Sequence, residues 1–126
     1  MSSRLLLDTH VLLWWLAGSE QLSRRTRDAI AAADAVYVSA ASAWELAIKA
    51  SLGKLRAPDD LEFQLRASRF TELPITVSHA LAAAQLARHH SDLFDRMLVA
   101  QAAAESLTLL TADSKLKVYD VKILFA

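Results

Sequence analysis

Short runs of consecutive apolar residues alternate along this chain with longer segments in which apolar residues recur every three or four positions. The short runs predict buried strands, and the longer segments predict helices with one apolar face. We expect strands at residues 4–8, 36–39, 107–110 and 121–125, with a further short strand within 70–75. We expect helices at residues 9–17, 19–33, 40–52, 59–68, 78–89 (capped by Ser78) and 93–105, and a short helical turn at 114–117. This alternation predicts one α/β domain over residues 1–126, a three-layer α/β/α sandwich around a mostly parallel sheet.

The composition fits a compact domain with little loop. The chain has 126 residues, of which 54% are hydrophobic, and it contains only two Gly and two Pro. No apolar run approaches the 18 or so residues that span a membrane, and Asp8 interrupts the first apolar run too early for a signal peptide. The lack of Cys excludes disulfides and thiolate metal sites, and it fits a reducing cytoplasm. Fourteen Lys and Arg balance fourteen Asp and Glu, so any nucleic-acid partner must be held by local contacts.

Four acidic residues are predicted to reach one edge of the sheet. Asp8 ends the first strand, and Asp113 follows the strand at 107–110 by three residues. Glu45 lies in the first turns of the helix that follows the second strand. Asp95 lies in the first turn of the helix that leads into the strand at 107–110, so it is also delivered to the carboxyl edge. Ligands of parallel α/β sheets bind outside the carboxyl ends of the strands, which makes this edge the candidate site.

Each of these acids also has a purely structural interpretation. Asp8 and Asp113 can cap the helical segments that follow them. Ser42 and Glu45 have the spacing of a capping box, and Asp95 can interact favourably with a helix dipole. Glu45 and Asp95 nevertheless interrupt apolar helix faces, where an uncompensated carboxylate is costly.

Four carboxylates that share one edge need a compensating cation. Two of them about 5 Å apart repel each other by roughly 3 kcal/mol at an effective dielectric constant of about 20. No Lys or Arg has a position in the sequence that would neutralise all four. A set of oxygen ligands without Cys or paired His indicates a hard divalent ion, Mg²⁺ or Mn²⁺. Such an ion activates water and stabilises developing charge during phosphodiester hydrolysis, which is the reaction that these residues favour.

Four segments combine these acids with a characteristic apolar context: LLLDTHVLLWWL, SAASAWELAIKASLGKL, FDRMLVAQA and LTLLTADSKLKVY. In their order and spacing they resemble the successive motifs of PIN-domain proteins, specifically the VapC-like toxins of toxin–antitoxin pairs. The resemblance implies a PIN-like fold and a Mg²⁺- or Mn²⁺-dependent endoribonuclease whose metal-site and catalytic acids are Asp8, Glu45, Asp95 and Asp113. It also implies an RNA substrate, a cognate protein antitoxin, a homodimer and a cytoplasmic location without membrane attachment.

The segment HHSDLFDRM contains two aspartates, and only one is assigned to the site. Asp92 is the better helix cap, whereas Asp95 shares a helix face with Val99. The acid of the family motif precedes an apolar run, which also selects Asp95. Many relatives carry Pro where this chain has Leu93.

Other residues are candidates for supporting roles. Thr9 and Thr111 lie next to the acids, and the resemblance matches Thr111 to a polar residue often found beside them. Arg96 is expected to contact the RNA backbone, to orient a carboxylate or to form a surface ion pair. Lys49 is expected either along the phosphate path or on a solvated helix face. Trp44 is expected in the core or at a dimer contact.

Two other classes of function stay open at this point. A receiver-like phosphoacceptor domain needs an acidic pair after the first strand, whereas a single Asp8 is followed here by Thr9. A phosphatase of the haloacid dehalogenase type needs an acid two residues after Asp8, where this chain has His10. A catalytically silent α/β interaction module predicts that at least one of the four acids is missing, and none is. The sequence does not select an RNA target, and DNA cleavage stays open.

Overall fold

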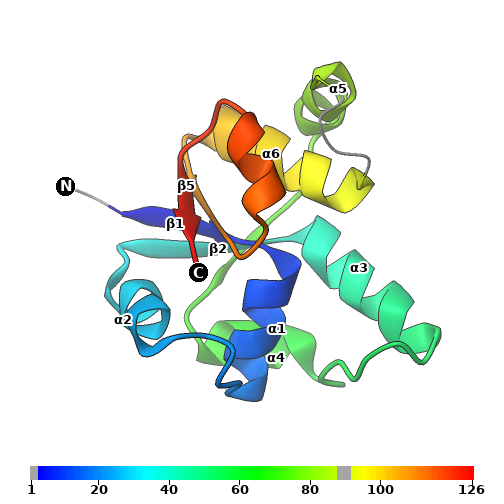
Figure 1. Cartoon of the computed structure of the whole chain (residues 1–126). Coiled ribbons are helices and arrows are strands. Elements are labelled where there is room, and N and C mark those ends of the chain that lie inside the picture. Colours follow the sequence, from blue (N-terminus) through cyan, green and yellow to red (C-terminus); the bar gives the residue numbers. More distant parts are fainter. Residues whose placement is uncertain (1–2, 88–91) are drawn as a thin grey trace.

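The structure is a computed structural model that describes residues 3–87 and 92–126 (Figure 1). Strands and helices alternate along the described chain, as the sequence predicts. Their bounds are β1 (Arg4–Leu7), α1 (Thr9–Ala17), α2 (Arg24–Ala32), β2 (Ala35–Ser39), α3 (Ala40–Ser51), α4 (Leu61–Ala67), β3 (Thr71–Leu73), α5 (Val77–Gln85), α6 (Leu93–Glu105), β4 (Thr108–Thr111), the 3₁₀ helix η1 (Ser114–Val118) and β5 (Ile123–Phe125).

The five strands form one parallel sheet in the order β3-β2-β1-β4-β5. Strand β1 is central, and its Leu6 is paired with Tyr37 of β2 on one side and with Leu109 of β4 on the other. The backbone N–H of Asp8 donates to the Leu110 carbonyl at 3.0 Å, which continues the pairing one residue beyond β1. Asp8 is therefore fixed at the middle of the carboxyl edge.

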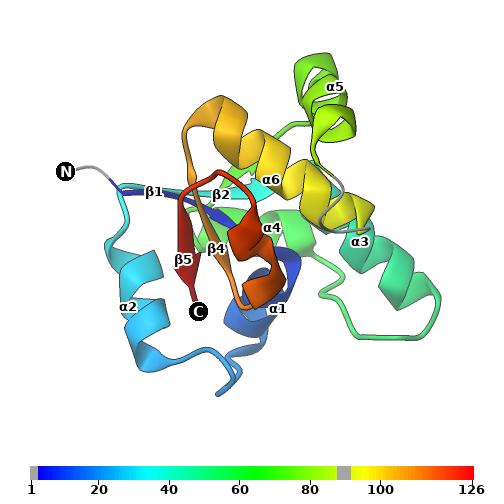
Figure 2. The same ribbon diagram turned by 45° about the horizontal axis from the view of Figure 1, so that its top comes forward.

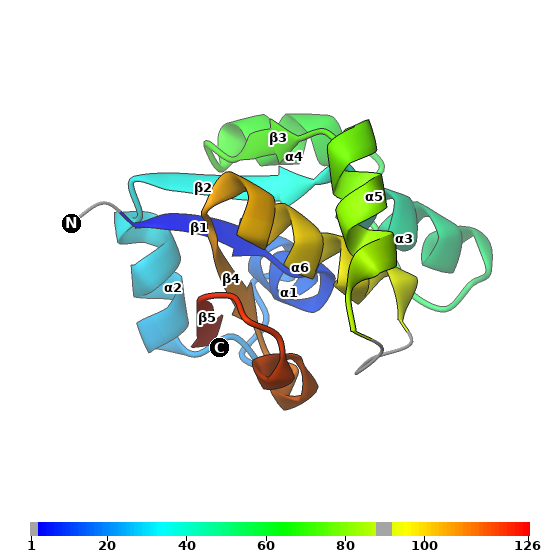
Figure 3. The same cartoon turned by 90° about the horizontal axis from the view of Figure 1, so that it is seen from above.

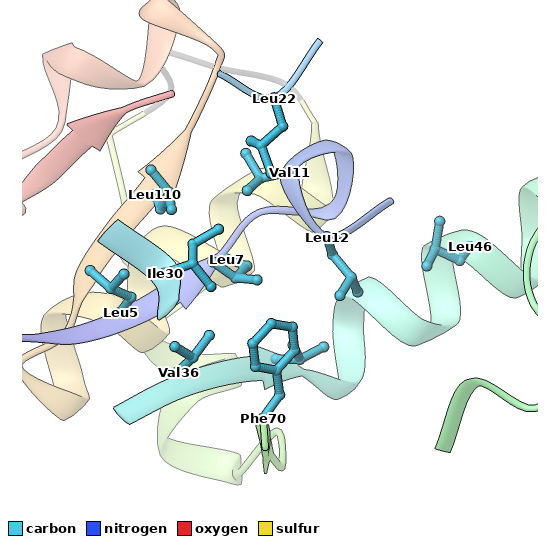
Figure 4. Close-up of a cluster of buried hydrophobic side chains, with 11 residues drawn as sticks. Leu5, Leu7, Val11, Leu12, Leu22, Ile30, Val36, Leu46, Phe70 and Leu110 are labelled. Carbon is cyan, nitrogen blue, oxygen red and sulfur yellow. The ribbon is translucent and has the colours of Figure 1, made fainter. Parts of the chain in front are cut away.

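Helices cover both faces of the sheet, which confirms the three-layer sandwich. Successive side chains of a strand point to opposite faces, so Leu5 and Leu7 belong to one core cluster and Leu6 to the other. Helices α1, α2 and α4 pack on the first face, while α6 and η1 pack on the second (Figures 1 and 3). Figure 4 shows the first cluster, in which Leu7 of β1 and Leu110 of β4 come from opposite halves of the chain.

Two helix starts are displaced from prediction because other side chains supply the caps, while α3 and α4 differ from their predicted ranges, 40–52 and 59–68, by one or two residues at their ends. Helix α2 begins at Arg24, five residues later than expected, because the Ser23 side chain accepts from the Thr26 N–H. Helix α5 begins at Val77 because Thr76 caps it, so the predicted cap Ser78 is wrong. Helix α5 ends at Gln85, and the last two residues of its predicted range, 88 and 89, lie outside the described residues.

No helix in the described ranges 3–87 and 92–126 combines the length and the apolar character needed to cross a membrane.

Candidate active site at the carboxyl edge of the sheet

The first turns of α1, α3 and α6 gather at the same end of the sheet (Figures 1 and 2). Each helix brings one of the predicted acids to that end: Asp8 precedes α1, Glu45 lies in α3 and Asp95 lies in the first turn of α6. Strand β4 ends there as well, and it is followed by Asp113. The structure thus confirms that the four acids share one edge.

Asp8 uses its two carboxylate oxygens for different purposes. Oδ1 accepts the Val11 N–H at 2.8 Å and so caps α1. Oδ2 accepts the hydroxyl of Thr111 at 2.5 Å. The capping interpretation of Asp8 is therefore correct, but it accounts for only one oxygen of a carboxylate that is 4% exposed.

Burial raises the pKa of the Asp8 carboxyl above its ordinary value, since removal from water penalises the charged form. The hydrogen bonds from Thr111 and Val11, the charge of His10 and the Ala112 backbone N–H act in the opposite direction and reduce this increase. The fold therefore holds at this point an acid whose negative charge is only partly compensated by the protein.

Thr111 connects Asp8 to Asp113. Its side chain is fully buried at the end of β4, where the hydroxyl donates to Asp8 and accepts the Asp113 N–H at 3.0 Å. Asp113 in turn caps η1 by accepting the Lys115 N–H at 2.9 Å, as its structural interpretation predicts. The ends of two neighbouring strands are thus joined by one hydrogen-bonded chain, with Thr111 beside the acid as expected.

Glu45 is buried on α3, one turn after Ser42. Ser42 is not a helix cap: the cap of α3 is Ser39, whose side chain accepts the Ala41 N–H, so the capping-box interpretation of Ser42 and Glu45 is wrong. The hydroxyl of Thr9 donates to Ser42 Oγ at 3.1 Å and links α1 to α3. The sequence did not suggest this contact for Ser42. Ser42 and Glu45 are three residues apart, however, and this spacing places both side chains on the same face of α3.

Lys49 makes an ion pair with Glu45. Its Nζ lies 2.7 Å from Glu45 Oε2, one helical turn away, and its side chain is 34% exposed. Lys49 is therefore not on a purely solvated face, and the expectation that it lines the phosphate path stays a prediction. It neutralises one of the four acids.

Asp95 is half-buried in the first turn of α6. Asp92 caps this helix by accepting the N–H groups of Phe94 and Asp95 with one oxygen, at 2.9 and 3.1 Å. The assignment of Asp92 as the cap is confirmed, and the cap fixes the backbone that carries Asp95.

Arg96 does not lie on the surface. Only 8% of it is exposed, and its guanidinium donates to the carbonyls of Ala83 at 2.9 Å and Leu86 at 3.0 Å, at the end of α5. The expected RNA contact and the expected surface ion pair both require an accessible side chain, so both are wrong. The periodicity of α6 could not reveal this role, because the carbonyls that Arg96 contacts belong to another helix.

The donor chemistry of this edge fits a hard divalent cation, since buried carboxylates and hydroxyls are the oxygen ligands of such ions. The side chains are not drawn together into a finished site: within residues 3–87 and 92–126, no three acidic or imidazole groups are close enough to hold a metal ion. The hydrogen bond to Thr111 and the ion pair to Lys49 instead occupy oxygens of Asp8 and Glu45. The metal-ligand assignment therefore stays a prediction.

A parallel sheet with helices on both faces and acids along its carboxyl edge defines a small α/β/α domain with an acidic site. The sequence model of the PIN domain family matches residues 5–122, and the chain belongs to this family.

Known proteins with related sequences or folds agree with this assignment. The chain is 34% identical over 115 residues to "Ribonuclease VapC22" of Mycobacterium tuberculosis, a match that covers 89% of this chain and 88% of that protein. Its fold is similar to that of VapBC2 from Rickettsia felis, solved with a promoter DNA fragment, with a TM-score of 0.73, 15% identity and coverage of 97% and 98% of the two chains. It is also similar to DNA-bound VapBC from Salmonella typhimurium, with a TM-score of 0.66, 19% identity and coverage of 99% and 98%.

Proposed function

We propose that this chain is an endoribonuclease that hydrolyses RNA phosphodiester bonds with the help of Mg²⁺ or Mn²⁺, and that it is the toxin of a toxin–antitoxin pair acting in the cytoplasm. The main support for the proposal is the buried carboxylate of Asp8 at the centre of the carboxyl edge. The chain that holds it is 34% identical to a ribonuclease over most of its length. The acids named by the sequence lie along this same edge.

Asp8, Glu45, Asp95 and Asp113 would hold the ion. When bound, the ion supplies an activated water and stabilises the negative charge that develops on the phosphate. Thr111 fixes the direction of the Asp8 carboxylate through its hydroxyl. Lys49 occupies Glu45 Oε2, so Glu45 would bind the ion through Oε1 or give up this ion pair to bind it through Oε2.

The proposed partners are a cognate antitoxin and a second copy of the chain. Several structural neighbours are toxin–antitoxin complexes, including one from Klebsiella pneumoniae, and these support the antitoxin. Helix α5 supports the homodimer, since Val77 and Leu81 are 76% and 63% exposed and residues 77–85 contain no Asp, Glu, Lys or Arg. Leu81→Glu is expected to shift the sedimentation coefficient from that of a dimer to that of a monomer, while Phe63→Glu on α4 leaves it unchanged.

The test of the activity is RNA cleavage by the purified, antitoxin-free chain in Mg²⁺, in Mn²⁺ and in EDTA. We expect cleavage with either ion and none in EDTA, and we expect Asp8→Asn to abolish it. Asp28→Asn replaces an exposed acid of α2 and serves as the matched control, with full activity expected. A DNA strand of the same sequence shows whether cleavage needs RNA, and labelling by acetyl phosphate would instead indicate a phosphoacceptor. Equal activity of wild type and Asp8→Asn contradicts the proposal.

A further inference from the structure

An aromatic pair lies at the surface where α3 and α6 meet. Trp44 of α3 is 62% exposed, so the expectation of a core position for this residue is wrong. Its ring contacts that of Phe94 of α6 edge to face, with the centroids 5.4 Å apart and an angle of 76° between the planes. Trp15, in contrast, is packed against Phe70 and donates its indole N–H to Ser68. Trp44 is thus a large aromatic surface that the described fold leaves open to solvent.

This pair stands directly beside two of the acids. Trp44 immediately precedes Glu45, and Phe94 immediately precedes Asp95. Neighbouring positions on an α-helix are separated by about 100° around the axis, since a turn takes about 3.6 residues. The rings therefore lie on the flanks of α3 and α6 next to the faces that carry Glu45 and Asp95, and they form part of the rim of the candidate active site.

The charge of the chain explains why an aromatic rim is useful for binding RNA. Lys and Arg together equal Asp and Glu in number, and the acids at the site repel phosphate until a cation is present. Affinity for RNA therefore cannot come from a general positive field. Stacking of bases on aromatic side chains is an alternative source that does not depend on net charge and that accepts any base.

We propose that Trp44, held in place by Phe94, stacks against a nucleobase of single-stranded RNA and so positions the neighbouring phosphodiester at the acids. This inference rests on the proposed ribonuclease function and adds to it a binding site for a base. An edge-to-face contact uses only part of the indole surface and leaves a ring face available for a flat partner. The substrate class that this rim fits is an unpaired RNA segment, because bases in a duplex are already stacked on each other.

The test compares two RNA probes that differ only in their bases. The first is a 5′-fluorescein-labelled single-stranded RNA of 12 nucleotides with randomised sequence, and the second is the same ribose-phosphate chain without bases. Fluorescence anisotropy in EDTA measures binding without cleavage. We expect Trp44→Ala to weaken binding of the first probe roughly 10-fold or more, and Trp44→Phe to restore most of it. Neither substitution changes binding of the abasic probe.

Phe63→Ala is the matched control, since Phe63 is 58% exposed but lies on α4. It is expected to bind both probes as the wild type does. Far-ultraviolet circular dichroism and sedimentation of each variant accompany the binding data, to exclude misfolding and to record the oligomeric state.

Each alternative result has a definite meaning. The stacking proposal is overturned if Trp44→Ala binds the base-containing probe as tightly as wild type, even if cleavage with Mg²⁺ is normal. It is also overturned if Trp44→Ala becomes monomeric and loses affinity for both probes equally, because Trp44 is then a contact between copies. If wild-type protein cleaves RNA with metal but binds the base-containing probe in EDTA no more tightly than the abasic one, stacking is overturned and the ribonuclease proposal stands. If it neither binds the probes in EDTA nor cleaves RNA with metal, both proposals fail.

Discussion

Arg96 offers a quantitative test of how α5 is attached to the domain. Helix α5 buries only His79 among its nine residues, so its apolar contribution to the core is small. Its last turn is held by the Arg96 guanidinium, which donates to the carbonyls of Ala83 and Leu86 at 2.9 and 3.0 Å. Arg96→Met keeps much of the aliphatic stem and removes these donors.

The magnitude is taken from these two hydrogen bonds, because the third bond from Arg96 to this segment, to the Ala87 carbonyl, is long at 3.4 Å. A bond from a charged donor contributes roughly 1.5–3 kcal/mol, so the pair is worth about 3–6 kcal/mol. Part of this loss of stability is offset, because the Met side chain carries no charge that has to be removed from water on folding. We therefore expect Arg96→Met to lower the free energy of unfolding by about 2–4 kcal/mol, against a total of about 5–15 kcal/mol for a typical domain. Arg96→Lys is expected to recover about half of this loss in the free energy of unfolding, since an ammonium group lacks the planar fork of the guanidinium.

Urea unfolding followed by circular dichroism measures this difference, and amide hydrogen exchange locates it. Exchange is expected to increase first in the last turn of α5, because the substitution removes the hydrogen bonds that hold this turn, while the contacts of His79 with Gln101 and Glu105 near its start remain. Arg25→Met, at an exposed position of α2, is the matched control and should change stability by less than about 0.5 kcal/mol. A loss below about 1 kcal/mol in Arg96→Met, with unchanged exchange in α5, would show that Arg96 does not hold α5 on the domain.

Three further predictions concern the acids. The folded-state pKa of Asp8 is raised, so its contribution to stability is present below the ordinary carboxyl pKa and is lost as the pH rises through the folded value. Metal-free Asp8→Asn should therefore be more stable than wild type in urea unfolding at neutral pH. This difference in the free energy of unfolding should shrink on acidification. Lys49→Met removes the cation beside the buried Glu45 and should tighten Mn²⁺ binding roughly two- to tenfold in calorimetric titration. Even an exposed i,i+4 pair is worth about 0.3–0.5 kcal/mol, and Lys49 also repels the ion. Weaker binding would contradict this. Thr111→Val removes the hydroxyl that donates to the Asp8 carboxylate. It should lower the free energy of unfolding by about 1–3 kcal/mol and slow RNA cleavage. A variant as stable and as active as wild type would show that Thr111 does not position Asp8.

Much of the fold follows from local signals in the sequence. Helices α1 and α6 have the predicted bounds, 9–17 and 93–105, because each is preceded by an aspartate that caps it. The expectation that four acids share the carboxyl edge also holds, because it depends only on strand direction and on where each acid lies along its element.

Other features depend on contacts between distant segments and could not be predicted locally. Two serines close in sequence, Ser39 and Ser42, offer alternative caps for α3, and the fold selects Ser39 while Ser42 accepts a hydrogen bond from the hydroxyl of Thr9. Arg96 looks like a surface residue in the sequence, and it is buried because the carbonyls at the end of α5 accept its hydrogen bonds. The exposure of Trp44 is equally invisible to hydrophobic periodicity, which treats every tryptophan as a core residue.

The proposed activity requires that the acids at the carboxyl edge bind one or more divalent cations. Anomalous diffraction from a crystal soaked in Mn²⁺ tests it most directly. We expect an anomalous peak bounded by carboxylate oxygens of Asp8 and at least one other of the four acids, with Glu45 displaced from Lys49 if it binds through Oε2. A map without a peak at this edge, with the Asp8–Thr111 and Glu45–Lys49 contacts unchanged, would show that these acids do not form a metal site.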